Sequence, residues 1–211
     1  SSGLLAYRSA IGCTATPFRS NELESLVLWN ELLHEYTASE AFRDGVVVPP
    51  ELVLWNGGEA RLDDVCLDLI RRVLDRGPGL ANATSIDDAE KFASFLSDAG
   101  IRVQAVHSKL SREQVANRIE WLRCGAGQVL VHVDMLSEGV DLPWLRWLCM
   151  RRPIKSRVRF CQEVGRVLRS APGKDRAWLL DPHDLFDSFG LTYEAVIGEA
   201  LREKREVERS E

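Results

Sequence analysis

The chain has 211 residues, of which 45% are hydrophobic and 28% are charged, and its formal net charge is −5 at pH 7. No stretch approaches the roughly 18 to 20 uninterrupted apolar residues of a membrane span and no signal-peptide pattern opens the chain, so we expect a cytoplasmic protein without a membrane partner. The 5 cysteines are odd in number and widely spaced, and the 4 histidines show no HExxH spacing, which argues against a disulfide framework and against a metal site.

The first sixty residues are predicted to form short, separate elements. "SAIGCTAT", residues 9–16, has the composition of an apolar strand that ends before Pro17, because the residue before a proline avoids helical geometry. The next segment, 22–36, carries apolar residues at near-helical spacing and predicts a helix. Two strand-like runs then flank a Pro-Pro pair. We interpret 21–60 as a connector rather than as part of a core.

From residue 61 onward the pattern alternates regularly between helices and strands. Helices are expected at 62–75, 86–100, 111–125 and 156–169, and strands at 80–84, 101–107, 128–134, 145–150 and 176–181. Ser85 and Ser111 suit helix starts, and Gly100 suits a helix stop. The alternation predicts an α/β fold whose parallel sheet is covered on both faces and binds ligands at the carboxyl ends of its strands. The charged stretch 186–211 predicts a solvated helical tail, with an interaction tail as the alternative.

Basic residues concentrate in one stretch of this acidic chain. Seven of them, against one acid, lie in 151–169. On a helix, Gln162, Arg166 and Arg169 would share one face, and Gly165 removes a side chain where another group must come close. Arginine presents planar, permanently charged donors that suit phosphate oxygens. This face therefore predicts a phosphate site, with a solvated basic helix face as the alternative.

Acidic and hydroxyl side chains follow two of the predicted strands. After "QVLVHVD" the loop offers Glu138, Gly139 and Asp141, which at the carboxyl end of a strand suit a ribose, a metal-bound water or a phosphate-sensing turn. A plain turn is the alternative. Near the N-terminus, Thr14 and Thr16 lie on the same side of an extended chain and can relay hydrogen bonds from a catalytic centre to a neighbouring surface.

Three of these stretches, in this order, resemble motifs of superfamily 2 helicases and translocases. "TATPFR" resembles motif III, "VDMLSEGVDLP" motif V and "QEVGRVLR" motif VI, while 79–108 lies where motif IV and the following helix and strand belong. The resemblance covers about 11–181. It is closest to the DEAD/DEAH-related group that includes type I and III restriction motor subunits and nucleotide-excision-repair helicases. It implies a RecA-like three-layer sandwich with a mostly parallel sheet, the fold of the helicase C-terminal domain.

The resemblance implies roles in ATP hydrolysis for residues of motifs V and VI. Arg169 would be the arginine finger that reaches the γ-phosphate of ATP, and Arg166 would support it. Gln162 would position these arginines or the attacking water. The nucleotide-contact residues would be Gly139, Asp141, Glu138 and Gly165.

The resemblance also implies coupling and nucleic-acid contacts. Thr14 and Thr16 would couple hydrolysis to strand movement. Ser85, Ser108 and Lys109, at strand ends of the same sheet, would contact phosphates of a single nucleic-acid strand. Helix capping by Ser85 and a turn at the other two residues are the alternatives.

Two parts of an ATP site are missing from the sequence. It contains neither a GxxxxGK[ST] P-loop nor a Walker B acid pair. The resemblance therefore implies a second motor lobe, with ATP and Mg²⁺ held mainly by a first RecA-like lobe that lies upstream or on another polypeptide. We expect the chain alone not to hydrolyse ATP. DNA is the expected nucleic acid, and the basic stretch 151–159 would face either the inter-lobe cleft or the nucleic-acid backbone.

On this interpretation the chain divides into four parts. They are the end of the first motor lobe (1–20), the inter-lobe connector (21–60), the C-terminal RecA-like domain (61–185) and the charged tail (186–211). The main alternative is a non-catalytic nucleic-acid-binding or regulatory module that kept the fold. A Rossmann-like enzyme for small molecules would need a GxGxxG turn after its first strand, which the sequence lacks.

Overall fold

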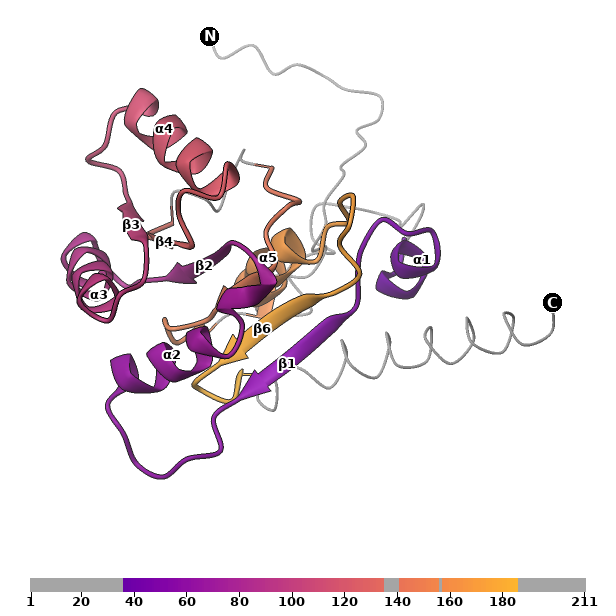
Figure 1. The fold of residues 1–211 in the computed structure, drawn as a ribbon. Helices are drawn as coiled ribbons and strands as arrows, with labels where there is room; N and C mark the ends of the chain where they lie inside the picture. Colours follow the sequence, from indigo (N-terminus) through magenta and orange to yellow (C-terminus); the bar gives the residue numbers. More distant parts are fainter. Residues whose placement is uncertain (1–35, 135–140, 156, 186–211) are drawn as a thin grey trace, which may run out of the picture.

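The computed structural model describes residues 36–134, 141–155 and 157–185. Its centre is a parallel sheet of six strands in the order β1-β6-β5-β2-β4-β3 (Figure 1). The strands are β1 (Pro50–Leu54), β2 (Gly79–Asn82), β3 (Val103–Val106), β4 (Val129–His132), β5 (Trp147–Cys149) and β6 (Ala177–Asp181). The parallel α/β fold predicted from the alternating pattern is confirmed.

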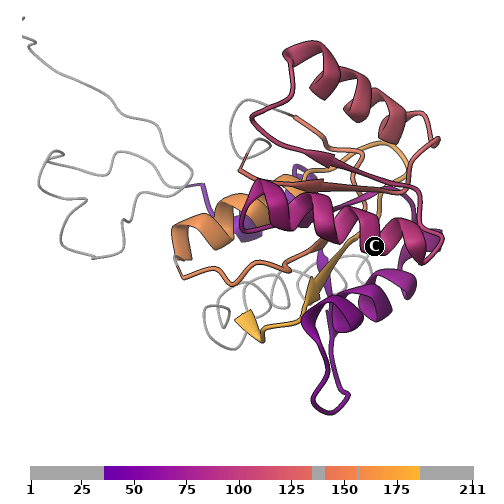
Figure 2. The same ribbon diagram turned by 90° about the vertical axis from the view of Figure 1, so that its left-hand side faces the viewer.

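Helices cover both faces of this sheet (Figures 1 and 2). They are α1 (Ala38–Arg43), α2 (Leu62–Arg71), the short 3-10 helix η2 (Leu74–Arg76), α3 (Ile86–Asp98), α4 (Arg112–Arg123) and α5 (Arg157–Val167). Phe92 of α3 belongs with Val131 to the core layer that also contains α2. Leu122 of α4 and Val164 of α5 belong with Leu130 to the opposite layer. Successive residues of β4 thus enter opposite layers, as the alternation of side chains along a strand requires.

The predicted helix starts at Ser85 and Ser111 are confirmed. The Ser85 hydroxyl accepts a hydrogen bond from the backbone N–H of Asp88 at 3.1 Å. The Ser111 hydroxyl accepts from the N–H of Gln114 at 3.1 Å, and the Gln114 side chain accepts from the N–H of Ser111 at 2.8 Å, which completes a capping box. Gly100, with φ of 83°, follows the end of α3 in the left-handed conformation that ends many helices.

The structure differs from the predicted connector, 21–60, near its end. Residues Pro50–Leu54 form β1, an edge strand that pairs in parallel with β6. Just before it, Val48 is buried, and its N–H donates to the carbonyl of Leu168 at 2.7 Å. The Pro-Pro pair indicated a break, but proline is tolerated at the first residue of an edge strand. The last part of the predicted connector therefore belongs to the sheet.

The end of α5 also differs from the prediction. The helix ends at Val167, and Arg169 forms an antiparallel bridge with Val47. Periodicity predicted one helical face for Gln162, Arg166 and Arg169, and this was wrong for Arg169. Pairing with the chain before β1 replaces the last helical turn, and no local pattern reports such pairing.

Several predictions concern residues outside the described ranges. They are the strand at 9–16, nearly all of the helix at 22–36, the tail at 186–211, and the candidate residues Thr14, Thr16, Glu138 and Gly139. Within the part of the chain that the structure describes, none of the helices is long and apolar enough to cross a membrane.

Candidate functional site

The candidate residues lie at opposite edges of the sheet. Ser85 follows β2, and Ser108 and Lys109 follow β3, so these three exposed residues lie at the edge where the parallel strands end. α5 begins after β5 at this carboxyl edge and runs back along the sheet for 11 residues, a length of about 16 Å. Arg169, just beyond α5, therefore lies at the amino edge, beside Val47 at the entry to β1.

Asp141 lies next to Arg169 at this amino edge. Nη1 of Arg169 donates to Oδ1 of Asp141 at 2.5 Å, and the two side chains are 49% and 66% exposed. The sequence placed Asp141 at the carboxyl end of the strand before it. The structure differs, because the segment from Asp141 leads directly into β5, whose first residues lie at the amino edge beside the start of β2.

Gln162, Gly165 and Arg166 lie along α5 between the two edges. The Gln162 side chain is exposed, and Arg166 is half-buried. A Cβ added to Gly165 would meet no atom of the described residues within 4 Å. Packing inside the described part of the chain therefore does not require glycine here. No described residue therefore occupies the space that a side chain at this position would fill.

Lys174 is a residue of this edge that the sequence did not reveal. It is buried, and its Nζ donates to the carbonyls of Pro143, Val167 and Arg169 at 2.8, 2.6 and 2.9 Å. Burial, and then the nearby positive charge of Arg146, lower the pKa of Lys174 to about 8. Backbone carbonyls have no signature in the sequence, so no spacing of residue types could have indicated these contacts.

A buried polar network joins α5 to the ends of β2, β4 and β5. Nδ2 of Asn82 donates to Glu163 at 2.5 Å, and Oδ1 of Asn82 accepts from the N–H of Arg152 at 2.6 Å. The Arg152 guanidinium donates to Glu163 and, at 2.6 Å, to Asp134. Burial alone would raise the pKa of Asp134, but the hydrogen bond from Arg152 helps to hold it below its usual value. These contacts fix the middle of α5, at Glu163, against the carboxyl ends of these strands.

Arg151 forms a second buried ion cluster. Its guanidinium donates to Asp63 at 2.9 Å and, through two nitrogens, to Asp88 at 2.7 and 2.8 Å, and lies 4.4 Å from the centre of the Phe92 ring. Burial raises the pKa of Asp88, but hydrogen bonds, first among them that from Arg151, outweigh burial and lower this pKa to about 2. The guanidinium groups of both arginines that follow β5 are thus buried and paired with carboxylates of the described residues. The expectation that 151–159 faces the inter-lobe cleft or a nucleic-acid backbone stays a prediction.

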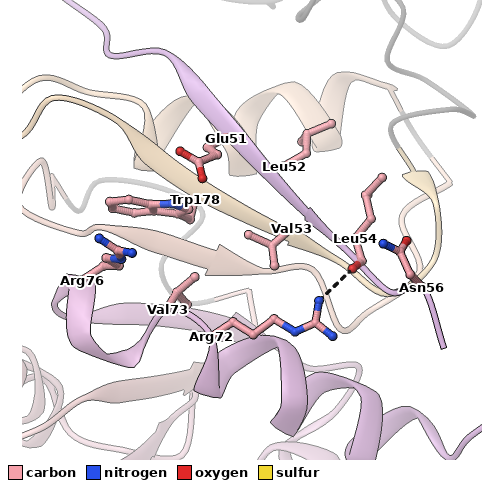
Figure 3. Close-up of a pocket in the computed structure, with 9 residues that line it drawn as sticks. All are labelled: Glu51, Leu52, Val53, Leu54, Asn56, Arg72, Val73, Arg76 and Trp178. Atoms are coloured by element: carbon pink, nitrogen blue, oxygen red, sulfur yellow. Dashed lines mark hydrogen bonds between the residues drawn. The ribbon is translucent and has the colours of Figure 1, made fainter.

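A cavity of about 330 Å³ lies beside the edge strand β1 (Figure 3). Side chains of β1, Arg72, Val73, Arg76 and Trp178 line it. Nη1 of Arg72 donates to the carbonyl of Leu54 at 3.4 Å, and the Arg76 guanidinium lies 5.5 Å from the centre of the Trp178 ring. None of the candidate residues from the sequence lines this cavity.

A family model described as the helicase conserved C-terminal domain matches residues 63–171. The chain belongs to this family. The matched range begins in α2 and ends just after Arg169, so it contains most of the sheet, both ion clusters and the candidate residues at both edges. The superfamily 2 membership and the RecA-like fold predicted from three short motifs are confirmed for this helicase C-terminal domain.

Two curated relatives illustrate the sequence similarity of the domain. The putative helicase 22 of Sulfolobus islandicus filamentous virus is 34% identical over 116 residues, which cover 54% of this chain and 21% of that protein. UvrABC system protein B of Kosmotoga olearia is 28% identical over 134 residues, which cover 61% of this chain and 20% of that protein. The chain thus spans about a fifth of the length of these relatives.

Solved structures share the fold at lower identity. The C-terminal domain of the DEAD-box protein Dbp5 matches with a TM-score of 0.55 and 16% identity, over 74% of this chain and 88% of that one. Dbp5 of S. cerevisiae bound to RNA and ADP BeF3 matches with a TM-score of 0.58 and 18% identity, over 78% of this chain and 42% of that one. The type ISP restriction-modification enzyme LlaBIII bound to DNA matches with a TM-score of 0.53 and 21% identity, over 69% of this chain and 13% of that one. Likeness at these identities concerns the fold alone.

Proposed function

We propose that this domain is the second motor lobe of an ATP-dependent superfamily 2 helicase or translocase and that Arg169 is its arginine finger. The observation that supports the proposal is that Arg169 lies at the amino edge. Its side chain is oriented there by a hydrogen bond to Asp141 and is still about half exposed. A guanidinium in an exposed pair keeps its charge at all working pH values and can exchange its carboxylate for a phosphate. This is the chemistry that an arginine finger needs.

The same proposal gives roles to the other candidate residues of motifs V and VI. Arg166 and Gln162 would support and position the finger from α5, while Gly139, Asp141, Glu138 and Gly165 would lie against the nucleotide. ATP would supply the phosphoryl group, and Arg169 would stabilise the negative charge that develops on it.

The remaining parts of the motor would lie on a first RecA-like lobe. The sequence has no P-loop and no Walker B pair, so ATP and Mg²⁺ would be held mainly there. Residues 1–20 would be the end of that lobe, with Thr14 and Thr16 coupling hydrolysis to movement. We place the start of the second lobe at β1 rather than at residue 61, because β1 pairs with β6.

Comparing Arg169→Ala with Arg176→Ala, in the motor assembled with its first lobe, tests the finger. Both side chains are 49% exposed and pair with a surface carboxylate. We expect Arg169→Ala to lower nucleic-acid-stimulated ATP turnover by roughly 10³- to 10⁵-fold with nearly unchanged nucleic-acid affinity, and Arg176→Ala to change neither. Equal turnover in the two variants would favour a non-catalytic binding module instead.

We further propose that the carboxyl edge contacts a single strand of DNA through Ser85, Ser108 and Lys109. All three are exposed at the carboxyl edge, where Ser85 follows β2 and Ser108 and Lys109 follow β3, with β4 between these two strands. Among proteins of the same fold, LlaBIII is bound to DNA and Dbp5 to RNA. Lys109→Ala should weaken DNA binding and reduce the slope of log K against log salt by about 1. Arg123→Ala, at the other end of α4, serves as control. An unchanged salt slope in Lys109→Ala, or tighter binding of RNA than DNA, would contradict this assignment.

A further inference from the structure

Lys174 satisfies all three of its ammonium protons with backbone carbonyls. Its Nζ lies 2.8 Å from the oxygen of Pro143, 2.6 Å from that of Val167 and 2.9 Å from that of Arg169. An ammonium group has three donors and no acceptor, so these three bonds complete its hydrogen-bonding capacity. The residue is only 7% exposed, and water therefore has little access to the cluster.

The three carbonyls come from the segments that carry the Arg169–Asp141 pair. Val167 is the last residue of α5, Arg169 is the finger itself, and Pro143 follows Asp141 by two residues. One buried ammonium therefore ties the backbone of Arg169 to the backbone beside Asp141. The ion pair between their side chains is exposed, and such pairs contribute only about 0 to 1 kcal/mol. It is too weak to hold the two segments in place by itself.

The charge at Lys174 is not needed to fill space. An apolar side chain would fill the same volume without removing a charge from water, which is costly unless the charge is fully hydrogen-bonded. Burial and the charge of Arg146 lower the pKa of Lys174 to about 8, which leaves the ammonium form dominant at neutral pH. Three carbonyl dipoles directed at one point are compatible with a cation and with no apolar group.

We propose that Lys174 is the positioning residue of the arginine finger, fixing the backbone of Arg169 against the segment of Asp141 so that the guanidinium reaches the nucleotide. The proposal rests on the proposed role of Arg169. Lys174 touches neither nucleotide nor nucleic acid, and it acts only through the residues whose carbonyls it binds.

The first test compares Lys174→Met and Lys174→Arg in the assembled motor. A 1 Å displacement of a catalytic group costs on the order of 100-fold, so we expect Lys174→Met to lower kcat by about 10- to 100-fold with nearly unchanged KM for ATP and affinity for DNA. Lys174→Arg keeps charge and donors and should recover part of kcat. Lys91→Met, at an exposed lysine paired with Asp87, should leave kcat unchanged. No loss of kcat in Lys174→Met would overturn the proposal.

A double-mutant cycle separates positioning from general stability. In the Arg169→Ala background, Lys174→Met should have almost no further effect on kcat, because the group that it positions is gone. An equal fold-loss in both backgrounds would mean a merely structural role and would overturn the proposal. A large loss in Arg169→Ala with unchanged kcat in Lys174→Met would overturn the positioning role alone, whereas unchanged kcat in Arg169→Ala would overturn the finger as well.

Amide hydrogen exchange in the chain itself gives a readout independent of turnover. The N–H of Val48 donates to the carbonyl of Leu168 at 2.7 Å, and the N–H of Ser170 donates to that of Val46 at 3.0 Å. Both amides should exchange faster in Lys174→Met than in Lys91→Met. Equal exchange rates at these two amides would show that Lys174 does not hold this segment.

Discussion

Arg169 and Asp141 meet at the amino edge of the sheet, 28 residues apart in sequence, with Nη1 and Oδ1 separated by 2.5 Å. Both side chains remain about half exposed or more, at 49% and 66%. The carboxylate therefore orients the guanidinium without burying it. Contacts that stabilise this edge, by contrast, lie underneath the pair, in the backbone bonds of Lys174 and in the bridge between Arg169 and Val47.

Replacing Asp141 should disturb the orientation of Arg169 with little effect on the stability of the fold. Asp141→Ala removes an exposed pair, so the free energy of unfolding should fall by no more than about 1 kcal/mol. ATP turnover in the assembled motor should fall by about tenfold or more, because Arg169 loses its preferred orientation. Asp175→Ala, at an exposed carboxylate that pairs with Arg176, is the matched control. A drop in stability without a drop in turnover would contradict this expectation.

Replacing Arg152, in contrast to replacing Asp141, should cause a large loss of stability. Arg152→Met leaves the buried carboxylate of Glu163 without its main partner, and breaking a buried pair in this way costs about 3 to 5 kcal/mol. Urea unfolding measures the loss. Arg159→Met, which removes a 43% exposed arginine from the same cluster, should cost much less. If Arg152 instead contacted nucleic acid, Arg152→Met would weaken DNA binding while leaving stability intact.

Gly165→Ala should stabilise the chain and slow the motor. The added methyl meets no atom of the described residues within 4 Å, and alanine in a helix is favoured over glycine by about 0.5 to 1 kcal/mol. The proposed site, however, brings another group close to this turn of α5, so turnover should fall by about tenfold or more. Gly58→Ala adds a methyl to open space elsewhere and should leave turnover unchanged. A variant that is both more stable and fully active would show that nothing approaches Gly165.

Stability should depend on acid pH through Asp88. Its pKa is about 2 in the folded chain against a usual value of 3.8, so between these values the unfolded state binds more protons. The contribution of Asp88 is therefore complete above pH 4 and is lost as the pH falls from about 4 to about 2. In urea unfolding, the advantage of the wild type over Asp88→Asn should shrink over this range. The exposed neighbour offers the control Asp87→Asn, which should follow the wild-type pH dependence. A stability difference between the wild type and Asp88→Asn that stays constant down to pH 2 would contradict the lowered pKa of Asp88.

Features that depend on neighbouring residues could be predicted from the sequence. Ser85 and Ser111 cap helices through N–H groups three residues away, and Leu130 and Val131 enter opposite layers because strands alternate. Such patterns are complete within a few positions of the chain. They were sufficient to predict the α/β class and the order of most elements.

Features that depend on distant partners could not. Arg151 looked like part of a basic surface because its partners, Asp63 and Asp88, lie 88 and 63 residues away. The edge at which Asp141 lies depends on the path of the chain between β4 and β5. The position of β1 in the sheet depends on its pairing with β6. A count of charges or a run of apolar residues contains none of this information.

The pairing of β1 with β6 also has a consequence for synthesis. Glu51 and Arg176, which form an ion pair where these strands begin, are 125 residues apart. At a ribosomal rate of about 5 to 20 residues per second, β1 is made on the order of 10 s before its partner. The sheet can assemble from β2, β4 and β5 during that interval, while β1, the first of these six strands to be synthesised, joins last. Until β6 is synthesised, β1 is an unpaired strand, and it is the segment that a nascent-chain chaperone would need to shield.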